Sequence, residues 1–280
     1  MSTTWGPAPS TGLDVTASSV VDAHFAACQG EYLDLVQAVG IRPGWHVLDA
    51  GCGGGGFLPA LTELVGPLGQ VSSVGLVAEH VPPSVRNAEA GHAERPVDVR
   101  QGSPLRLPYA DGTFDAVWCA DTLQYLDDDE LRLALSEMTR VVRDGGLVAI
   151  KDLDATLITT RPGDPFLFTD FFRLAAPVSG YARQLLRTRE LYRWLEDAGL
   201  TALRQWTVLI EHHAPFSLAA QRFYRTSCAQ LADRAIRLGA PGDWHAFLDP
   251  DRPGHPFDDP RAYLSEGNVL AVGVVDRGAR

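Results

Sequence analysis

The sequence predicts an α/β fold, a doubly wound and mostly parallel sheet with helices on both of its faces. Short apolar segments typical of buried strands alternate with segments of helical periodicity over much of the chain. Glycine and proline turns separate these segments. The 280 residues, 45% of them hydrophobic, are enough for one large core. Because parallel neighbours need crossover connections, the alternation indicates right-handed crossovers through helices.

The first strand is expected at residues 45–50, because this apolar run follows a Pro-Gly turn and stops at Gly51. A segment of broadly helical spacing at residues 18–39 precedes it. The later strands are expected, in chain order, at residues 70–76, 96–101, 114–120, 146–153, 203–211 and 268–275. The helices that follow the first strand are expected at residues 55–65, 81–90, 128–142 and 188–199.

Two segments, residues 154–187 and 215–263, are longer than ordinary connections between such elements. We interpret them as helical cap insertions over the carboxyl edge of the sheet, where Phe166–Phe172 and Leu218–Leu238 would form an apolar lid. In the alternative interpretation, their aromatic side chains complete a small satellite core. In either case the chain is expected to be one domain of 280 residues with an N-terminal arm and helix at residues 1–40.

The charge balance disfavours several classes of partner. The chain has 24 Lys and Arg against 35 Asp and Glu, a formal net charge of −11. An acidic surface repels phosphate backbones and anionic lipids. We therefore expect a small-molecule substrate and neither nucleic acid nor membrane as a partner.

The cysteine pattern indicates structural thiols. Four cysteines are spread along the chain without a CxxC pair, so neither a zinc knuckle nor a redox dithiol is predicted and no metal site is expected. The N-terminal residues lack the basic start and apolar run of a signal peptide, and no stretch approaches about 18 apolar residues. The expected location is the cytoplasm.

The strongest functional signal is a glycine-rich turn after the first strand, Val47-Leu48-Asp49-Ala50-Gly51-Cys52-Gly53-Gly54-Gly55-Gly56. Gly51 and Gly53 lack the Cβ atoms that would keep a ligand away, and the next helix offers N–H groups at its start. The last six of these residues match the GxGxxG pattern of dinucleotide-binding turns. A carboxylate at Asp49, however, would repel a pyrophosphate and would suit a ligand that carries an ammonium group.

At this point the sequence resembles the class I S-adenosylmethionine-dependent methyltransferases, whose first motif reads approximately VLDxGCGxG. The resemblance extends over about residues 43–153 with its pieces in order. Residues 101–103 and 107–115 resemble the adenine loop and fourth strand of the family, and residues 140–146 resemble the turn into the fifth strand. The resemblance implies a Rossmann-like sheet of seven strands, with the last strand antiparallel, and S-adenosyl-L-methionine as cofactor.

The resemblance also implies a set of cofactor-binding residues. Two positions depart from the family pattern: Gly75 stands where an acidic residue usually binds the ribose, and Ser103 replaces the commoner aspartate. Glu79, in the first turn of the next expected helix, is a candidate to replace the missing ribose ligand, although the helix macrodipole alone explains an acidic residue at this position. The complete expected set is Asp49, Gly51, Gly53, Gly75, Leu76, Glu79, Gly102, Ser103 and Ala120.

Methyl transfer is an in-line displacement at carbon, so the protein supplies positioning, exclusion of water and, for some acceptors, a base. The candidate bases are His212 and His213, at the end of the expected sixth strand, where alternation sends them to opposite faces. Both could instead be structural histidines. Asp121, Gln124 and Tyr125 follow the fourth strand, near the expected acceptor, although Tyr125 could equally belong to the core.

The expected function is transfer of a methyl group to an oxygen, nitrogen or carbon atom of a small, largely apolar, natural-product-like molecule. The missing ribose carboxylate leaves open a retained fold with another reaction, such as a cyclisation or rearrangement. A non-enzymatic binding protein is a third possibility. A nicotinamide-dependent oxidoreductase is disfavoured because no ribose-binding acid ends the second strand.

Overall fold

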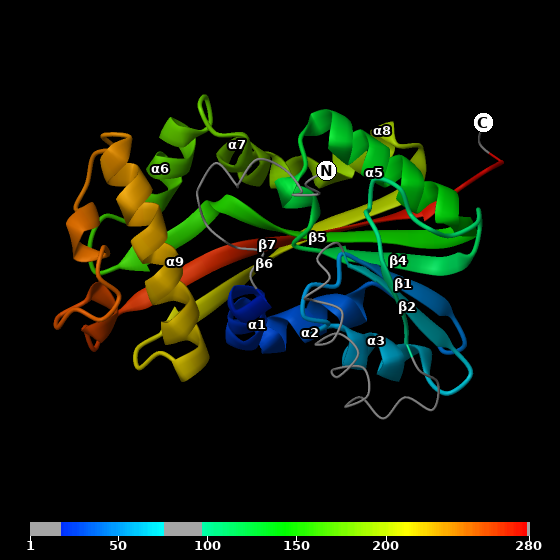
Figure 1. The fold of residues 1–280 in the computed structure, drawn as a ribbon, viewed down its shortest axis with the longest axis horizontal. Coiled ribbons are helices and arrows are strands. Elements are labelled where there is room, and N and C mark those ends of the chain that lie inside the picture. Colours follow the sequence, from blue (N-terminus) through cyan, green and yellow to red (C-terminus); the bar gives the residue numbers. More distant parts are fainter. Residues whose placement is uncertain (1–17, 76–96, 279–280) are drawn as a thin grey trace. The chain divides into compact units, whose positions relative to one another are not determined.

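Seven strands form one mixed sheet in the computed structural model, which describes residues 18–75 and 97–278 (Figure 1). The strand order is β3-β2-β1-β4-β5-β7-β6. The pairs β1–β2, β1–β4, β2–β3 and β4–β5 are parallel, whereas β7 runs antiparallel to its neighbours. The expected mostly parallel, Rossmann-like sheet is therefore confirmed. Its strands are β1 His46–Ala50, β2 Gln70–Gly75, β3 Asp98–Gln101, β4 Phe114–Ala120, β5 Val142–Arg161, β6 Leu200–His213 and β7 Tyr263–Val275.

The last three strands are longer than the sequence predicts. β5 begins before the expected position because Phe114 already pairs with Val142. The register shifts between Phe114 and Ala116, which accommodates the irregular residues 144–146 of β5. It then continues past the expected end into a run rich in Thr and Ile, which favour extended backbone. The expected bounds were too narrow because polar residues interrupt the apolar run inside the strand.

The helices agree with the expected alternation, with differences at their ends. The expected helix at residues 18–39 is two helices, separated at Cys28. α5 begins with a capping box, in which the Asp127 side chain accepts from the N–H of Glu130, and Glu130 accepts from the N–H of Asp127. The expected helix at residues 81–90 lies outside the described residues. The described helices are α1 Ser18–Ala27, α2 Gln29–Ala38, α3 Leu58–Val65, α5 Asp128–Val141, α6 Leu167–Ala175, α7 Gly180–Arg187, α8 Leu191–Asp197 and α9 Leu218–Arg237.

The described chain divides into two compact units, which we call unit 1 and unit 2. Unit 1 comprises residues 18–29, 153–188 and 207–268, and unit 2 comprises residues 30–75, 97–152, 189–206 and 269–278. In unit 2, α5 and α8 cover one face of the sheet and α2 and α3 cover the other (Figure 1). One core joins side chains of α5 and α8 to the sheet. The doubly wound arrangement expected from the sequence is present in unit 2.

Both expected cap segments, residues 154–187 and 215–263, belong to unit 1. Phe168 and Phe171 are buried in this unit, where both pack edge-on against Trp244. Phe166, by contrast, is 63% exposed. These aromatics therefore form a core of unit 1, as in the alternative interpretation, and their action as a lid stays a prediction.

Two further observations concern the cysteines and the helices. All four cysteines, Cys28, Cys52, Cys119 and Cys228, are buried thiols outside any disulfide bond, as expected. None of the helices in the described ranges has the length and apolar composition needed to cross a membrane.

Candidate active site

The glycine turn connects the carboxyl end of β1 to α3. Gly51, Gly53 and Gly55 have φ angles of 103°, 49° and 76°, a region in which only glycine is free of steric cost. The N–H of Gly51 donates to the carbonyl of Val74 on β2, at 2.8 Å. α3 begins at Leu58 without a side-chain cap. The turn thus follows a glycine-dependent path at the edge of the sheet where open α/β folds bind ligands.

Asp49 is the buried carboxylate of this turn. Its residue is 1% exposed, and its Oδ2 atom has no hydrogen-bond partner among the described residues. Burial raises the pKa of Asp49 to about 7, because removal from water disfavours the charged form. A buried carboxyl oxygen without a donor is costly unless a ligand supplies the donor. The site therefore fits a ligand that carries an ammonium group, as the sequence predicts.

Gly51 has a packing role that the sequence analysis missed. A Cβ atom on Gly51 would collide with Thr122 Oγ1 and would lie 2.8 Å from Thr122 Cγ2. The Thr122 hydroxyl donates to the carbonyls of Ala120 and Gly51, at 2.9 and 3.3 Å. The small size of Gly51 thus admits a protein side chain from the end of β4, and its role in leaving room for the ligand stays a prediction.

The ends of β2 and β3 meet beside the turn. The N–H of Gly102 donates to the carbonyl of Gly75, at 3.0 Å, and a Cβ atom on Gly75 would lie 3.2 Å from Cys52 Sγ. The Ser103 Oγ atom accepts from the N–H of Leu105 at 3.0 Å, and among the described residues no acceptor takes its own hydrogen. The structure therefore brings Gly75, Gly102 and Ser103 to the same edge as the glycine turn. The candidates Leu76 and Glu79 lie outside the described residues.

A charged pair joins the end of β4 to the middle of β5. Asp121, which has a φ angle of 50°, accepts two hydrogen bonds from Lys151 Nζ, at 2.8 and 2.7 Å. The Lys151 side chain is fully buried, and its Nζ lies 3.6 Å from the ring centroid of Tyr32 on α2. Gln124 is buried and Tyr125 is half-buried in the 3₁₀ turn Leu123–Tyr125 that follows. Lys151 and Tyr32 were missed, although a lone lysine inside an apolar strand was a usable signal.

The loop that resembles the family's adenine loop is held by α5. Glu137 accepts from the N–H of Leu107 at 2.9 Å, and Arg140 donates to the carbonyls of Tyr109 and Leu107 at 2.8 and 3.1 Å. Glu137 and Arg140 also form an ion pair of 2.7 Å. Hydrogen bonds of Arg140 thus join two segments that resemble family motifs, residues 107–115 and 140–146, as expected if both serve one site.

The candidate bases lie on opposite faces of β6, as alternation predicts, and both belong to unit 1. His212 is half-buried and its Nε2 shares a hydrogen bond of 3.2 Å with Tyr224 Oη on α9. His213 is exposed, with its ring centroid 5.1 Å from that of Tyr263. A second group of ligand-type side chains in unit 1, His24, Cys28 and Glu266, escaped the sequence analysis because nothing in their spacing links them.

The fold and the glycine turn with its buried carboxylate define a Rossmann-like enzyme that binds a small cationic cofactor. A methyltransferase domain family matches residues 48–150. The chain is 30% identical to a demethylmenaquinone methyltransferase of Alkalihalophilus pseudofirmus over 171 residues, which are 60% of this chain and 68% of that protein. A Staphylococcus aureus protein of the same name is 28% identical over 170 residues, 59% of this chain and 64% of its own length. The chain thus spans about two thirds of the length of these curated relatives.

Solved structures agree on the fold. The match to a SAM-dependent methyltransferase of Aquifex aeolicus has a TM-score of 0.51 at 22% identity and covers 71% of this chain and 92% of that one. The match to the YcgJ protein of Bacillus subtilis has a TM-score of 0.55 at 18% identity and covers 89% and 100%. The chain belongs to the class I S-adenosylmethionine-dependent methyltransferase family, and it is a methyltransferase that uses this cofactor.

The described residues fit S-adenosylmethionine. The cofactor supplies an electrophilic methyl group on a positively charged sulfur. Asp49 would offer its buried carboxylate to the ammonium group and Ser103 would offer its hydroxyl as a donor, while Gly102 and Gly75 leave the neighbouring strand ends without side chains. The protein's contribution to the displacement is to hold the reacting groups in line and to keep water out.

Proposed function

We propose that the acceptor is a small, largely apolar molecule of natural-product type, and that an aromatic ring of the quinone or hydroquinone kind carries the methylated atom. The observation that supports this is the distribution of exposed apolar side chains. Nine of the twelve large hydrophobic residues that are exposed in the described chain belong to unit 1, the smaller unit. These nine are Leu157, Phe166, Leu174, Val178, Leu209, Leu218, Ile236, Leu238 and Leu248.

A region enriched in exposed apolar side chains is a candidate for receiving apolar ligands or partners. The relatives' name, demethylmenaquinone methyltransferase, supports a ring substrate of this class for them, and we extend the class to this chain. Methylation of an electron-rich ring carbon or a ring hydroxyl requires loss of one proton from the acceptor, so a base is useful.

Within this proposal, His212 is the base and His213 is not. His212 is half-buried, and its hydrogen bond to Tyr224 holds the ring in one orientation, whereas His213 is exposed. His212→Asn should lower kcat about 100-fold or more, the usual contribution of a positioned base, while the matched variant His213→Asn should keep wild-type activity. Equal rates for both variants at all pH values would remove His212 from this role.

The acceptor class is tested with radiolabelled S-adenosylmethionine and three sets of acceptors: naphthohydroquinones, simple phenols, and polar amines or amino acids. We expect labelled product from the hydroquinones, with mass spectrometry showing the added methyl group. Methylation of the polar amines alone would refute the proposed acceptor class. Conversion of an acceptor without consumption of S-adenosylmethionine would support the cyclisation or rearrangement alternative.

A further inference from the structure

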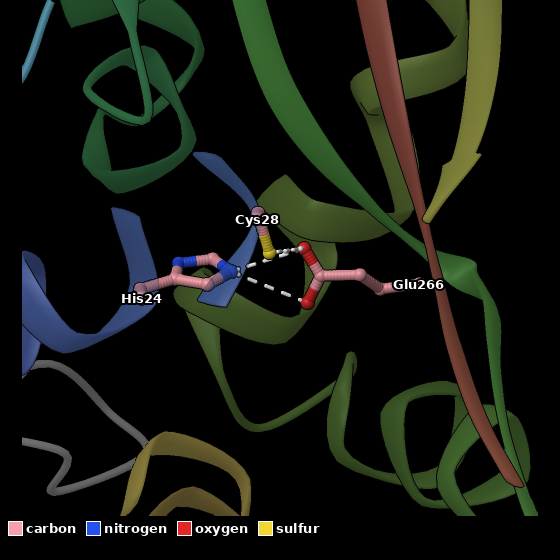
Figure 2. A group of neighbouring side chains, drawn as sticks. All are labelled: His24, Cys28 and Glu266. Atoms are coloured by element: carbon pink, nitrogen blue, oxygen red, sulfur yellow. Dashed lines mark hydrogen bonds and ion pairs between the residues drawn. The ribbon is translucent and has the colours of Figure 1, made fainter. Parts of the chain in front are cut away.

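Unit 1 contains a group of three side chains with different ligand atoms: the half-buried imidazole of His24, the buried thiol of Cys28 and the buried carboxylate of Glu266. Figure 2 shows His24, Cys28 and Glu266 directed at one point, and their ligand atoms all lie within 4.8 Å of one another. His24 lies in α1, and Cys28 follows one helical turn later, with its N–H donating to the His24 carbonyl at 3.1 Å. Glu266 comes from β7. All three residues belong to the same compact unit.

The distances from Glu266 to the other two side chains are close to those between ligands that share a metal ion. His24 Nε2 lies 3.0 and 3.3 Å from the two carboxylate oxygens of Glu266, and Cys28 Sγ lies 3.6 Å from Glu266 Oε1. Tetrahedral zinc, with bonds of about 2.0–2.3 Å, places its ligand atoms roughly 3.3–3.8 Å apart. The Cys28–Glu266 distance lies in this range, whereas the His24–Glu266 contacts lie at or just below it, so the carboxylate and the imidazole would move apart slightly to admit an ion.

We propose that His24, Cys28 and Glu266 bind a divalent transition-metal ion, with zinc as the favoured ion. Thiolate and imidazole ligands select zinc and its neighbours in the first transition series over magnesium and calcium. The charges also match, because one thiolate and one carboxylate neutralise a divalent cation. Cys28 is 0% exposed and the Glu266 side chain is 4% exposed. Because uncompensated charge is costly where water is excluded, ligands whose charges cancel that of the metal ion are favoured here.

Residues around the group hold the ligands in place. Asn268 Nδ2 donates to Glu266 Oε1 at 3.0 Å, and the His24 ring stacks on Phe223 with centroids 4.0 Å apart. The Tyr224 hydroxyl lies 3.3 Å from Cys28 Sγ. Such outer contacts orient metal ligands and are a regular feature of metal sites.

Metal binding at this group releases one proton. The S–H bond of Cys28 breaks, its proton passes to solvent, and a sulfur–metal bond forms, while His24 binds through the lone pair of a neutral ring. Metal affinity therefore rises with pH. Three protein ligands leave a fourth position for water or for an oxygen atom of a small molecule.

The first experiment uses the wild-type full-length protein and Co²⁺, which replaces zinc and reports its ligands by absorption. We expect one equivalent of Co²⁺ to produce a thiolate-to-cobalt charge-transfer band together with the strong visible bands of tetrahedral coordination. Zinc should remove both, and the zinc content after equilibrium dialysis should be about one ion per chain. Absence of the charge-transfer band and of stoichiometric zinc in the wild type would overturn the proposal.

The second experiment assigns the ligands. Cys28→Ser should abolish the charge-transfer band, whereas Cys228→Ser, which changes another buried cysteine of the same unit, should retain it. Asn268→Ala should weaken zinc binding about 10- to 100-fold and leave the band in place. A band that survives in Cys28→Ser would show that another cysteine binds the ion and would refute the assignment. Circular dichroism checks that each variant is folded.

Discussion

Thr122 occupies the position that a side chain on Gly51 would need. The two residues come from the carboxyl ends of neighbouring parallel strands, β4 and β1, and a Cβ atom on Gly51 would lie 2.9 Å from Thr122 Cβ and closer still to its hydroxyl. The glycine turn therefore depends on packing against the Thr122 side chain, in addition to its predicted role in leaving room for a ligand.

We expect Gly51→Ala to lower the free energy of unfolding by about 1–3 kcal/mol, since it adds this collision to a backbone with a φ angle of 103°. Urea unfolding measures the loss. Gly30→Ala is the matched control, because Gly30 lies in α2 and a Cβ atom added there would meet no described atom within 4 Å, so this variant should be neutral or slightly stabilising. A Gly51→Ala protein as stable as the wild type would contradict this view of the turn.

The buried carboxyl of Asp49 makes the stability of the cofactor-free protein depend on pH. Its pKa is raised from 3.8 to about 7 in the folded chain, so between these values the folded state keeps a proton that the unfolded state has lost. Stability must therefore fall as pH rises from about 4 to about 7 and stay level above that range. We expect Asp49→Asn to remove this loss and to be more stable at pH 8 by about 2–4 kcal/mol.

Cofactor binding should show the opposite trend, because the ammonium group requires the ionised carboxylate. The affinity of the wild type for S-adenosylmethionine should weaken up to about tenfold for each pH unit below 7 and level off above it, until the ammonium group of the ligand loses its own proton at about pH 8. Asp49→Asn should bind weakly and without this slope. Calorimetric titration across pH 5.5–8.5 measures both, and a wild-type affinity independent of pH would disprove the role of Asp49.

The missing acid at the end of β2 leads to a gain-of-binding prediction. Gly75 ends this strand where the family usually has an acidic residue, and a new Cβ would have only Cys52 Sγ nearby among the described atoms, at 3.2 Å. Gly75→Asp should therefore tighten S-adenosylmethionine binding about tenfold, the effect of one charged hydrogen bond. Gly75→Asn, equal in size but neutral, should gain less. Equal or weaker binding by Gly75→Asp would mean that this chain holds the ribose in another way.

The sequence was sufficient for those parts of the fold in which local pattern and tertiary structure agree. The strand at Phe114–Ala120 has its expected bounds, because a continuous apolar run between turns specifies a buried parallel strand. The extent of β5 was not predictable in the same way. Asp152 and Asp154 are buried inside it, and a buried polar residue in a strand depends on partners that only the folded chain supplies.

The candidate site likewise combines features that the local sequence predicts with features that only the folded chain shows. The glycine turn is a contiguous motif, so Asp49 and Gly102 could be recognised from their neighbours in sequence. The group of His24 and Glu266 joins residues 242 positions apart, and the contact of Lys151 with Tyr32 links β5 to α2. No local periodicity encodes such contacts, because they arise from the order of strands and the packing of helices.

The ion pair between Asp121 and Lys151 provides the last prediction. Asp121 has a φ angle of 50°, a conformation that Asn adopts as readily as Asp, so Asp121→Asn changes the charge without adding backbone strain. The buried Lys151 ammonium would then lose the carboxylate with which it forms its ion pair. We expect a loss of about 2–3 kcal/mol in the free energy of unfolding, below the full cost for a buried pair because Asp121 is 25% exposed.

Two further variants decide whether this loss comes from the unpaired charge. Lys151→Met combined with Asp121→Asn should recover much of the stability, since no uncompensated ammonium remains beneath Tyr32. Asp129→Asn, which breaks the exposed ion pair to Arg132, should leave the unfolding midpoint in urea unchanged. If Asp121→Asn is as stable as Asp129→Asn, the charge of Asp121 is not what holds Lys151, and packing alone stabilises the contact between the end of β4 and the middle of β5.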